Sequence, residues 1–308
     1  MLIFALLEQA AEAAGKFDAG KTIIEHVSNT SVEHPLIHLP KVLGIDFSVT
    51  KHVFMLWLVS AFVFIVATTV VRRSVRRDER VPSGFMNALE AVVEFIRDGI
   101  VRPNVGNKWV DAWTPLILTF FVFILCANAI GLIPVFDVIA LLDRWVLRTG
   151  EDSFVKHMLH GGTTATANFN VTAALATVTF FAIIVAGTRA HGFIQHWKNI
   201  VPSGMNPFMY VILVPIEVIS MFVRPFALTM RLAANMTGGH IAILAILSFV
   251  FMFAELFGRA AGIGVGLVVS VPLATGISAL EILIVLIQAY VFTLLTAVFI
   301  GMAIHAHH

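Results

Sequence analysis

The sequence predicts an all-α polytopic membrane protein with five membrane-embedded helices. Of its 308 residues 58% are hydrophobic and only 13% are charged, and the mean hydropathy is +0.91, well outside the range of soluble domains. Several uncharged runs approach the roughly 20 apolar residues that a helix needs to cross a hydrocarbon core. The net charge of +1 gives no reason to propose nucleic-acid binding, and the single Cys126 excludes an intrachain disulfide.

The N-terminal segment, residues 1–52, mixes charges, histidines and prolines without a sustained period, so we expect it to lie outside the membrane. The uncharged run from Val53 to Val71 is long enough to cross a bilayer and predicts the first spanning helix. The densest basic cluster of the chain, residues 72–80, follows it directly. The positive-inside rule assigns this cluster to the cytoplasmic side, which leaves the N-terminus outside.

Residues 83–101 predict an amphipathic helix along the cytoplasmic interface, with Ser83 as its N-cap. The apolar stripe of this helix faces either lipid or another part of the protein, and the spacing does not decide between them. Its apolar positions recur at helical spacing and comprise Phe85, Leu89, Val92, Val93, Ile96 and Ile100.

Residues 53–188 are predicted to hold three spanning helices in all. The second runs outward from about residue 113 to the Gly-Leu-Ile-Pro sequence that ends at Pro134. A charged outer loop, residues 137–168, connects it to a third span over about residues 171–187. The basic residues after this span agree with the cytoplasmic assignment of the first basic cluster.

Residues 189–308 are predicted to form a tilted helical hairpin. Its first helix, 207–256, has roughly 50 residues and a length of roughly 75 Å, far more than the hydrocarbon core of about 30 Å requires. It must therefore be strongly tilted or bent. Its last helix covers about 269–304 and places the C-terminus in the cytoplasm. The intervening turn carries small residues at four-residue spacing, which indicates close helix packing: Gly258, Gly262 and Gly266.

Several polar side chains interrupt the apolar pattern of the first hairpin helix. Glu217, Arg224 and Arg231 recur every seven residues and share one helix face at about 100° per residue. Asn235 lies near that face, whereas His240 falls on the opposite side. Because a buried arginine is costly in lipid, Arg231 is a candidate functional residue whose partner we expect on another chain. The alternative is that Arg231 pairs with a glutamate of its own chain.

The last hairpin helix carries a second polar stripe, with Glu281 and Gln288 seven residues apart. A membrane-embedded glutamate that exchanges protons is what a proton relay needs. The alternative is an inert, neutral carboxylic acid.

The run Arg231-Leu-Ala-Ala-Asn235-Met-Thr-Gly-Gly-His240, together with Glu281 and Gln288, resembles subunit a of F-type ATP synthases. Arg231, Asn235 and Gln288 stand at the positions of the family's pattern. The family also has an acid and an imidazole at the positions of His240 and Glu281, in either order, and here the histidine comes first.

This resemblance implies a stator that conducts protons through two offset half-channels to a carboxylate on each subunit of a rotating c ring. It implies that Arg231 faces that carboxylate, that Asn235, His240, Glu281 and Gln288 line the outer half-channel, and that Glu217 lines the inner one. It further implies b-type subunits of a peripheral stalk as partners and the bacterial inner membrane as the location. We expect no cofactor or metal and no catalysis by this chain alone, since it has no Gly-rich phosphate-binding loop with lysine.

Two other classes of function remain possible from the residues alone. A secondary transporter or ion channel could use Arg231 to bind an anionic substrate, but such proteins show inverted repeats with broken helices, and we see no internal repeat. A structural membrane anchor would make the interior polar residues dispensable.

Overall fold

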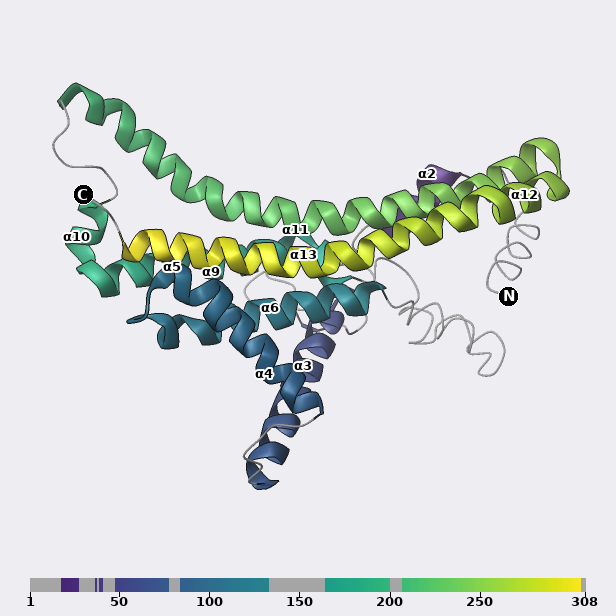
Figure 1. The fold of residues 1–308 in the computed structure, drawn as a ribbon. Coiled ribbons are helices and arrows are strands. Elements are labelled where there is room, and N and C mark those ends of the chain that lie inside the picture. The colour runs from purple at the N-terminus through teal and green to yellow at the C-terminus, as the bar shows by residue number, and fades with distance from the viewer. Residues whose placement is uncertain are drawn as a thin grey trace. The chain divides into compact units, whose positions relative to one another are not determined.

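The computed structural model describes residues 18–27, 37, 39–40, 48–77, 84–132, 164–199 and 207–305 (Figure 1). These residues are almost entirely helical, apart from one isolated β-bridge between Ile37 and Val49. The helical segments in chain order are α2 (Ala19–Val27), α3 (Lys51–Arg77), α4 (Phe85–Glu94), η1 (Phe95–Val101), α5 (Arg102–Val105), α6 (Val110–Leu132), η3 (Ala165–Ala167), α9 (Phe169–His191), α10 (Phe193–Lys198), α11 (Pro207–Phe257), α12 (Arg259–Val265), η4 (Gly266–Ser270) and α13 (Val271–Ile304).

Five helical segments in this part of the chain are long and apolar enough to cross a membrane. This confirms the predicted all-α fold class and its number of membrane-embedded helices. The last of them is longer than predicted, because α12, η4 and α13 follow one another without a break. The segments are His52–Arg73, Val110–Leu132, Phe169–His191, Phe208–Phe257 and Arg259–Ile304. The predicted division into 1–52, 53–188 and 189–308 describes a path across the membrane and stays a prediction.

The predicted interfacial helix 83–101 is present as α4 and η1, and α5 continues it to Val105. No residue of α4 is buried, whereas Ile96, Ile100 and Val105 lie in the core. The second half of the apolar stripe therefore packs against protein. The proposed N-cap Ser83 lies outside the described residues; Gly84, whose φ of 60° favours glycine, precedes the helix.

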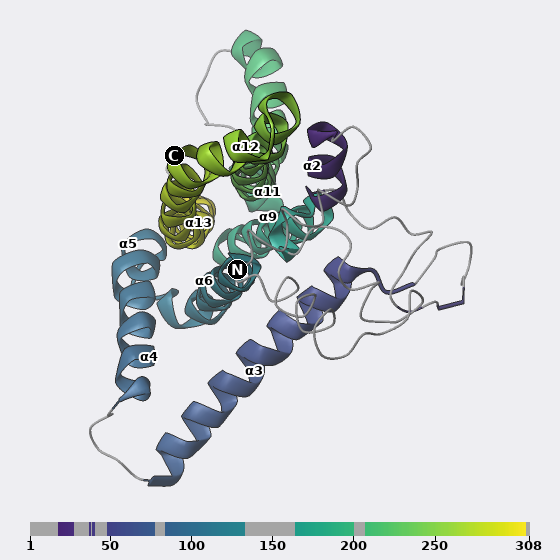
Figure 2. The ribbon, with the colours of Figure 1, turned by 90° about the vertical axis from the view of Figure 1, so that its right-hand side faces the viewer.

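The chain forms two compact units, each made of several segments. Unit 2 comprises residues 56–130, 166–233 and 286–308. Its core combines side chains of η1, α5, α6 and α9 with one half of α11 and the last part of α13. Figure 2 shows α5 beside α13, and a Cβ at Gly301 of α13 would collide with the backbone carbonyl of Asn104 in α5. Glycine at 301 therefore lets these two helices approach closely.

Unit 1 comprises residues 1–55, 131–165 and 234–285. Within it α12 turns back along the end of α11, as Figure 1 shows. Gly258, with φ of 89°, forms the turn. A Cβ at Gly262 would collide with Val250 and Ala254 of α11. The close helix packing predicted from the glycine spacing is therefore confirmed at this turn.

Candidate functional site

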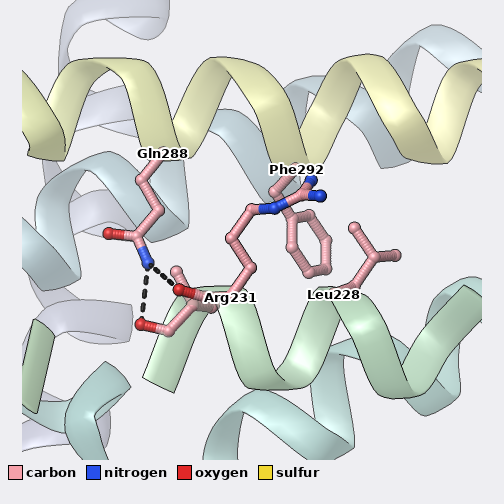
Figure 3. A pocket seen from close by; sticks show the side chains of 5 residues that line it. Leu228, Arg231, Gln288 and Phe292 are labelled. Carbon is pink, nitrogen blue, oxygen red and sulfur yellow. Dashed lines mark hydrogen bonds between the residues drawn. The ribbon is translucent and has the colours of Figure 1, made fainter. Parts of the chain in front are cut away.

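Arg231 lies on the exposed side of α11 in unit 2, next to α13. Its side chain lines a small pocket together with Leu228, Leu232, Gln288 and Phe292. Figure 3 shows its guanidinium extending along Phe292 and away from the amide of Gln288. No carboxylate among the described residues lies within 4.0 Å of this guanidinium. Within the described residues, the structure therefore does not support the alternative that Arg231 pairs with a glutamate of its own chain.

Gln288 of α13 binds the backbone of α11 at the level of Arg231. Its amide nitrogen donates to the carbonyl oxygen of Leu232 at 2.7 Å and to that of Arg231 at 3.3 Å. Its amide oxygen lies 3.5 Å from Nδ2 of Asn128 in α6, and the hydroxyl of Thr166 donates to Oδ1 of Asn128. A continuous row of neutral polar groups thus runs from η3 through α6 and α13 to α11.

Glu217 and Arg224, seven residues apart on α11, form a salt bridge in unit 2. The distance from Nη2 of Arg224 to Oε1 of Glu217 is 3.2 Å. The Arg224 guanidinium also lies 5.6 Å from the ring centroid of Phe299 in α13, within the range of a cation–π contact. Both side chains are half-buried, so Arg224 already has an acidic partner within its own helix, unlike Arg231.

In unit 1, His240 of α11 and Glu281 of α13 lie side by side. His240 Nδ1 is 3.7 Å from Glu281 Oε1, and His240 Nε2 is 2.8 Å from the hydroxyl oxygen of Thr164. The His240 side chain is 25% exposed and that of Glu281 9%. A Cβ at Gly239 would collide with the Glu281 carboxyl, so glycine at that position leaves room for the acid. The arrangement joins an imidazole and a carboxyl, which can exchange protons, to a hydroxyl that is hydrogen-bonded to the imidazole.

Asn235 is exposed on α11, one helical turn after Arg231. The structure thus brings His240 together with Glu281, and Gln288 together with the backbone of Arg231. It leaves Asn235 at the surface and pairs Glu217 with Arg224. Within the described ranges, no group of three or more His, Cys, Asp or Glu residues is placed to hold a metal ion.

Thr164 and Thr166 were not predicted as site residues, because both fall in the predicted outer loop 137–168. Both are buried, one just before and one within η3, and each contacts one of the polar clusters. A signal was present, because the run Gly161-Gly-Thr-Thr-Ala-Thr-Ala is uncharged although the loop before it is charged. Asn128 lies inside the second predicted span, but its contact with Gln288 could be found only from the structure.

These features define a class of protein. The chain is an integral membrane protein of long helices, with polar and ionisable side chains held between two of them in the apolar interior. The family described as ATP synthase A chain matches residues 53–301, and the chain belongs to this family.

Similar proteins cover nearly the whole chain. ATP synthase subunit a of Pelodictyon phaeoclathratiforme is 37% identical over 302 residues, which are 96% of this chain and 78% of the relative. ATP synthase subunit a 2 of Chlorobium luteolum is 40% identical over 304 residues, covering 95% of this chain and 79% of the relative. ATP synthase subunit a of Anaeromyxobacter dehalogenans is 37% identical over 270 residues, 86% of this chain and 60% of the relative.

Proposed function

We propose that this chain is the proton-translocating stator subunit of an F-type ATP synthase, with Arg231 facing the carboxylate of each passing c subunit. Membership of the ATP synthase A chain family supports a subunit of the membrane sector without a catalytic site of its own. The proposed role of Arg231 is supported by its position, because this side chain is exposed and has no carboxylate partner among the described residues. A lone cation is costly in lipid, so a partner subunit supplies the missing negative charge.

Arg231 acts in this proposal as a fixed positive charge. At close range such a charge favours the ionised form of a carboxyl group, so a ring site arriving with a proton releases it before passing. Arginine suits this role because its guanidinium stays charged under all physiological conditions. Proton release on one side and uptake on the other then make rotation of the ring directional.

The outer half-channel is formed in this proposal by Asn235, His240, Glu281 and Gln288. Support comes from the contacts of His240, whose two ring nitrogens face Thr164 and Glu281. An imidazole in this position can accept a proton at one nitrogen and release another from the second, so a proton crosses it with no net change. Glu217 lines the inner half-channel, where its salt bridge to Arg224 holds its carboxylate in place.

The proposed orientation in the membrane follows from the positions of the basic segments, and the proposed partner subunits follow from the family. We place the chain in a bacterial inner membrane with the N-terminus outside and the C-terminus in the cytoplasm, because the basic segments after the first and third spans then lie inside. The c-subunit ring and the b-type subunits of a peripheral stalk are its partners, within a lipid bilayer.

The test is Arg231→Ala in the assembled complex. ATP-driven acidification of membrane vesicles should be abolished, while the amount of assembled complex and the passive proton leak persist, because the ring then turns without discrimination between protonated and ionised sites. Arg259→Ala, which removes another exposed arginine, is the matched control and should leave pumping intact. Vesicles of Arg231→Ala that still acidify on addition of ATP would contradict the proposed role.

A further inference from the structure

The amide of Gln288 has one orientation that satisfies its neighbours. The atom that faces the carbonyl oxygens of Arg231 and Leu232, at 3.3 and 2.7 Å, must be a donor, since carbonyl oxygens only accept hydrogen bonds. The nitrogen of Gln288 therefore faces α11, and its oxygen faces Asn128. Figure 3 shows both bonds reaching the backbone and neither reaching the guanidinium.

The orientations of the next two groups, Asn128 and Thr166, follow in the same way. Because the oxygen of Gln288 accepts, Asn128 must turn its amide nitrogen toward it, at the longer distance of 3.5 Å. The oxygen of Asn128 then faces Thr166, whose hydroxyl donates to it. Gln288 is 4% exposed, and Asn128 and Thr166 are 0% exposed. A flipped amide at this depth would leave buried donors and acceptors unpaired, so the whole row is locked in one direction.

None of these three groups gains or loses a proton under physiological conditions. The row therefore differs in kind from a relay of titrating groups. Gln288, the last residue of the row, donates hydrogen bonds to two successive carbonyl oxygens of α11. These bonds lie next to the buried side chains of Leu228 and Leu232 on the same helix. Polar bonds and apolar contacts thus fix α11 against α13 at the residue that carries the exposed cation.

We propose that Thr166 and Asn128 are positioning residues for proton translocation: acting through Gln288, they hold the backbone at Arg231 so that its guanidinium is presented at a fixed place. This inference rests on the proposed function of Arg231 and names what positions it. Small displacements of a reacting group are costly, since a shift of about 1 Å can lower a rate by as much as about a hundredfold.

The test measures ATP-driven pumping per assembled complex. Thr166→Val removes the hydroxyl that orients Asn128 and should lower pumping by about tenfold, whereas Thr166→Ser keeps the donor and should restore it. Thr293→Val is the matched control: its hydroxyl is equally buried in α13 but donates only to carbonyls of its own helix, at 2.6 and 2.9 Å. It should pump like the unmodified complex.

A second pair of variants tests action through Gln288. Asn128→Asp places a carboxylate oxygen against the oxygen of Gln288 and should lower pumping at least as much as Thr166→Val. In a Gln288→Leu background, Thr166→Val should cause no further loss, because the group through which it acts is gone. Equal effects of Thr166→Val with and without Gln288 would overturn the inference, as would pumping by Thr166→Val at the level of Thr293→Val.

Arg231→Ala in the same membranes separates the two proposals. If it abolishes pumping while Thr166→Val and Asn128→Asp leave it unchanged, the positioning role is wrong and the function of Arg231 stands. If Arg231→Ala still pumps, the proposed function itself fails.

Discussion

The two polar clusters differ in what their members can do with a proton. The cluster in unit 1 consists of the hydroxyl of Thr164, the imidazole of His240 and the carboxyl of Glu281, and the imidazole is partly exposed. In unit 2, Asn128 and Gln288 with Thr166 join two amides and a hydroxyl that are closed from solvent and end on backbone carbonyls. Each cluster draws one threonine from the same short segment and one residue from α13. The first cluster contains the groups that can move protons, and we propose that the second holds the backbone at Arg231 in place.

The largest expected effect comes from breaking the titratable cluster. Glu281→Gln keeps the size of the side chain but removes its acid, and we expect ATP-driven pumping to fall by at least about tenfold. The double replacement His240→Glu with Glu281→His restores one acid and one imidazole and should recover part of the loss. The measurement is a double-mutant cycle over a range of pH. It compares the pumping rates of His240→Glu, Glu281→His and the double variant with that of the unmodified complex.

The pH dependence of those rates sharpens the comparison. Exchanging His240 and Glu281 should change the shape of the pH profile, whereas Thr166→Val should lower the rate at every pH by the same factor. Additive effects of the two single replacements would contradict a shared role for His240 and Glu281.

An intermediate effect is expected at two neighbouring glycines of α11. A Cβ at Gly239 would collide with the carboxyl of Glu281, whereas a Cβ at Gly238 would meet nothing within 4 Å. Gly239→Ala should therefore displace Glu281 from His240 and lower pumping several-fold, which is less than the roughly hundredfold loss that a misplacement of about 1 Å can cause. Gly238→Ala should have little effect, since alanine is the better helix former. Equal pumping by the two variants would mean that the position of Glu281 does not matter.

The uncharged apolar runs predicted the spanning helices well, because length and apolarity alone decide which helices can cross a membrane. The start of α6 at Val110 and the end of α9 at His191 differ from the predicted bounds by a few residues, since charged residues continue a helix beyond the apolar run. The position of His240 beside Glu281 was also predictable from the hairpin. The family resemblance, and not periodicity, singled out these two residues as a pair.

The supporting residues could not be predicted in the same way. Thr164 and Thr166 occupy a short helical turn whose contacts depend on tertiary packing and leave no repeating pattern in the sequence. The stripe of residues 83–101 was compatible with lipid or protein, and only the packing of Ile96 and Ile100 decided for protein. Neutral polar residues such as Asn128 carry little signal in a hydropathy profile, although Asn128 hydrogen-bonds to both Gln288 and Thr166 in the structure.

The smallest expected effect concerns a histidine outside both clusters. His196 in α10 is buried against Gly187, and burial together with the charge of His191 lowers the pKa of its imidazole below the ordinary value of about 6.5. The folded chain therefore favours neutral His196, and the unfolded chain binds the proton more readily. Stability is then fully present above about pH 6.5 and falls as the pH drops below that value.

His196→Gln should reduce this loss of stability at low pH and leave pumping near neutral pH unchanged. Thermal inactivation of the complex at about pH 5.5 and about pH 7.5 measures it. An unchanged difference between the two pH values would show that the loss of stability arises elsewhere in the complex.

We propose above all that the surface of α11 around Arg231 faces the c ring. Ala227 and Asn235 are exposed one turn before and after Arg231, whereas Leu232 is 1% exposed. In a background with Cys126 replaced by serine, cysteines at Ala227 and Asn235 should crosslink to cysteines on the carboxylate-bearing helix of a c subunit, and a cysteine at Leu232 should not. Full labelling of the first two by a lipid-soluble thiol reagent, with no crosslink to any ring subunit, would contradict the claim.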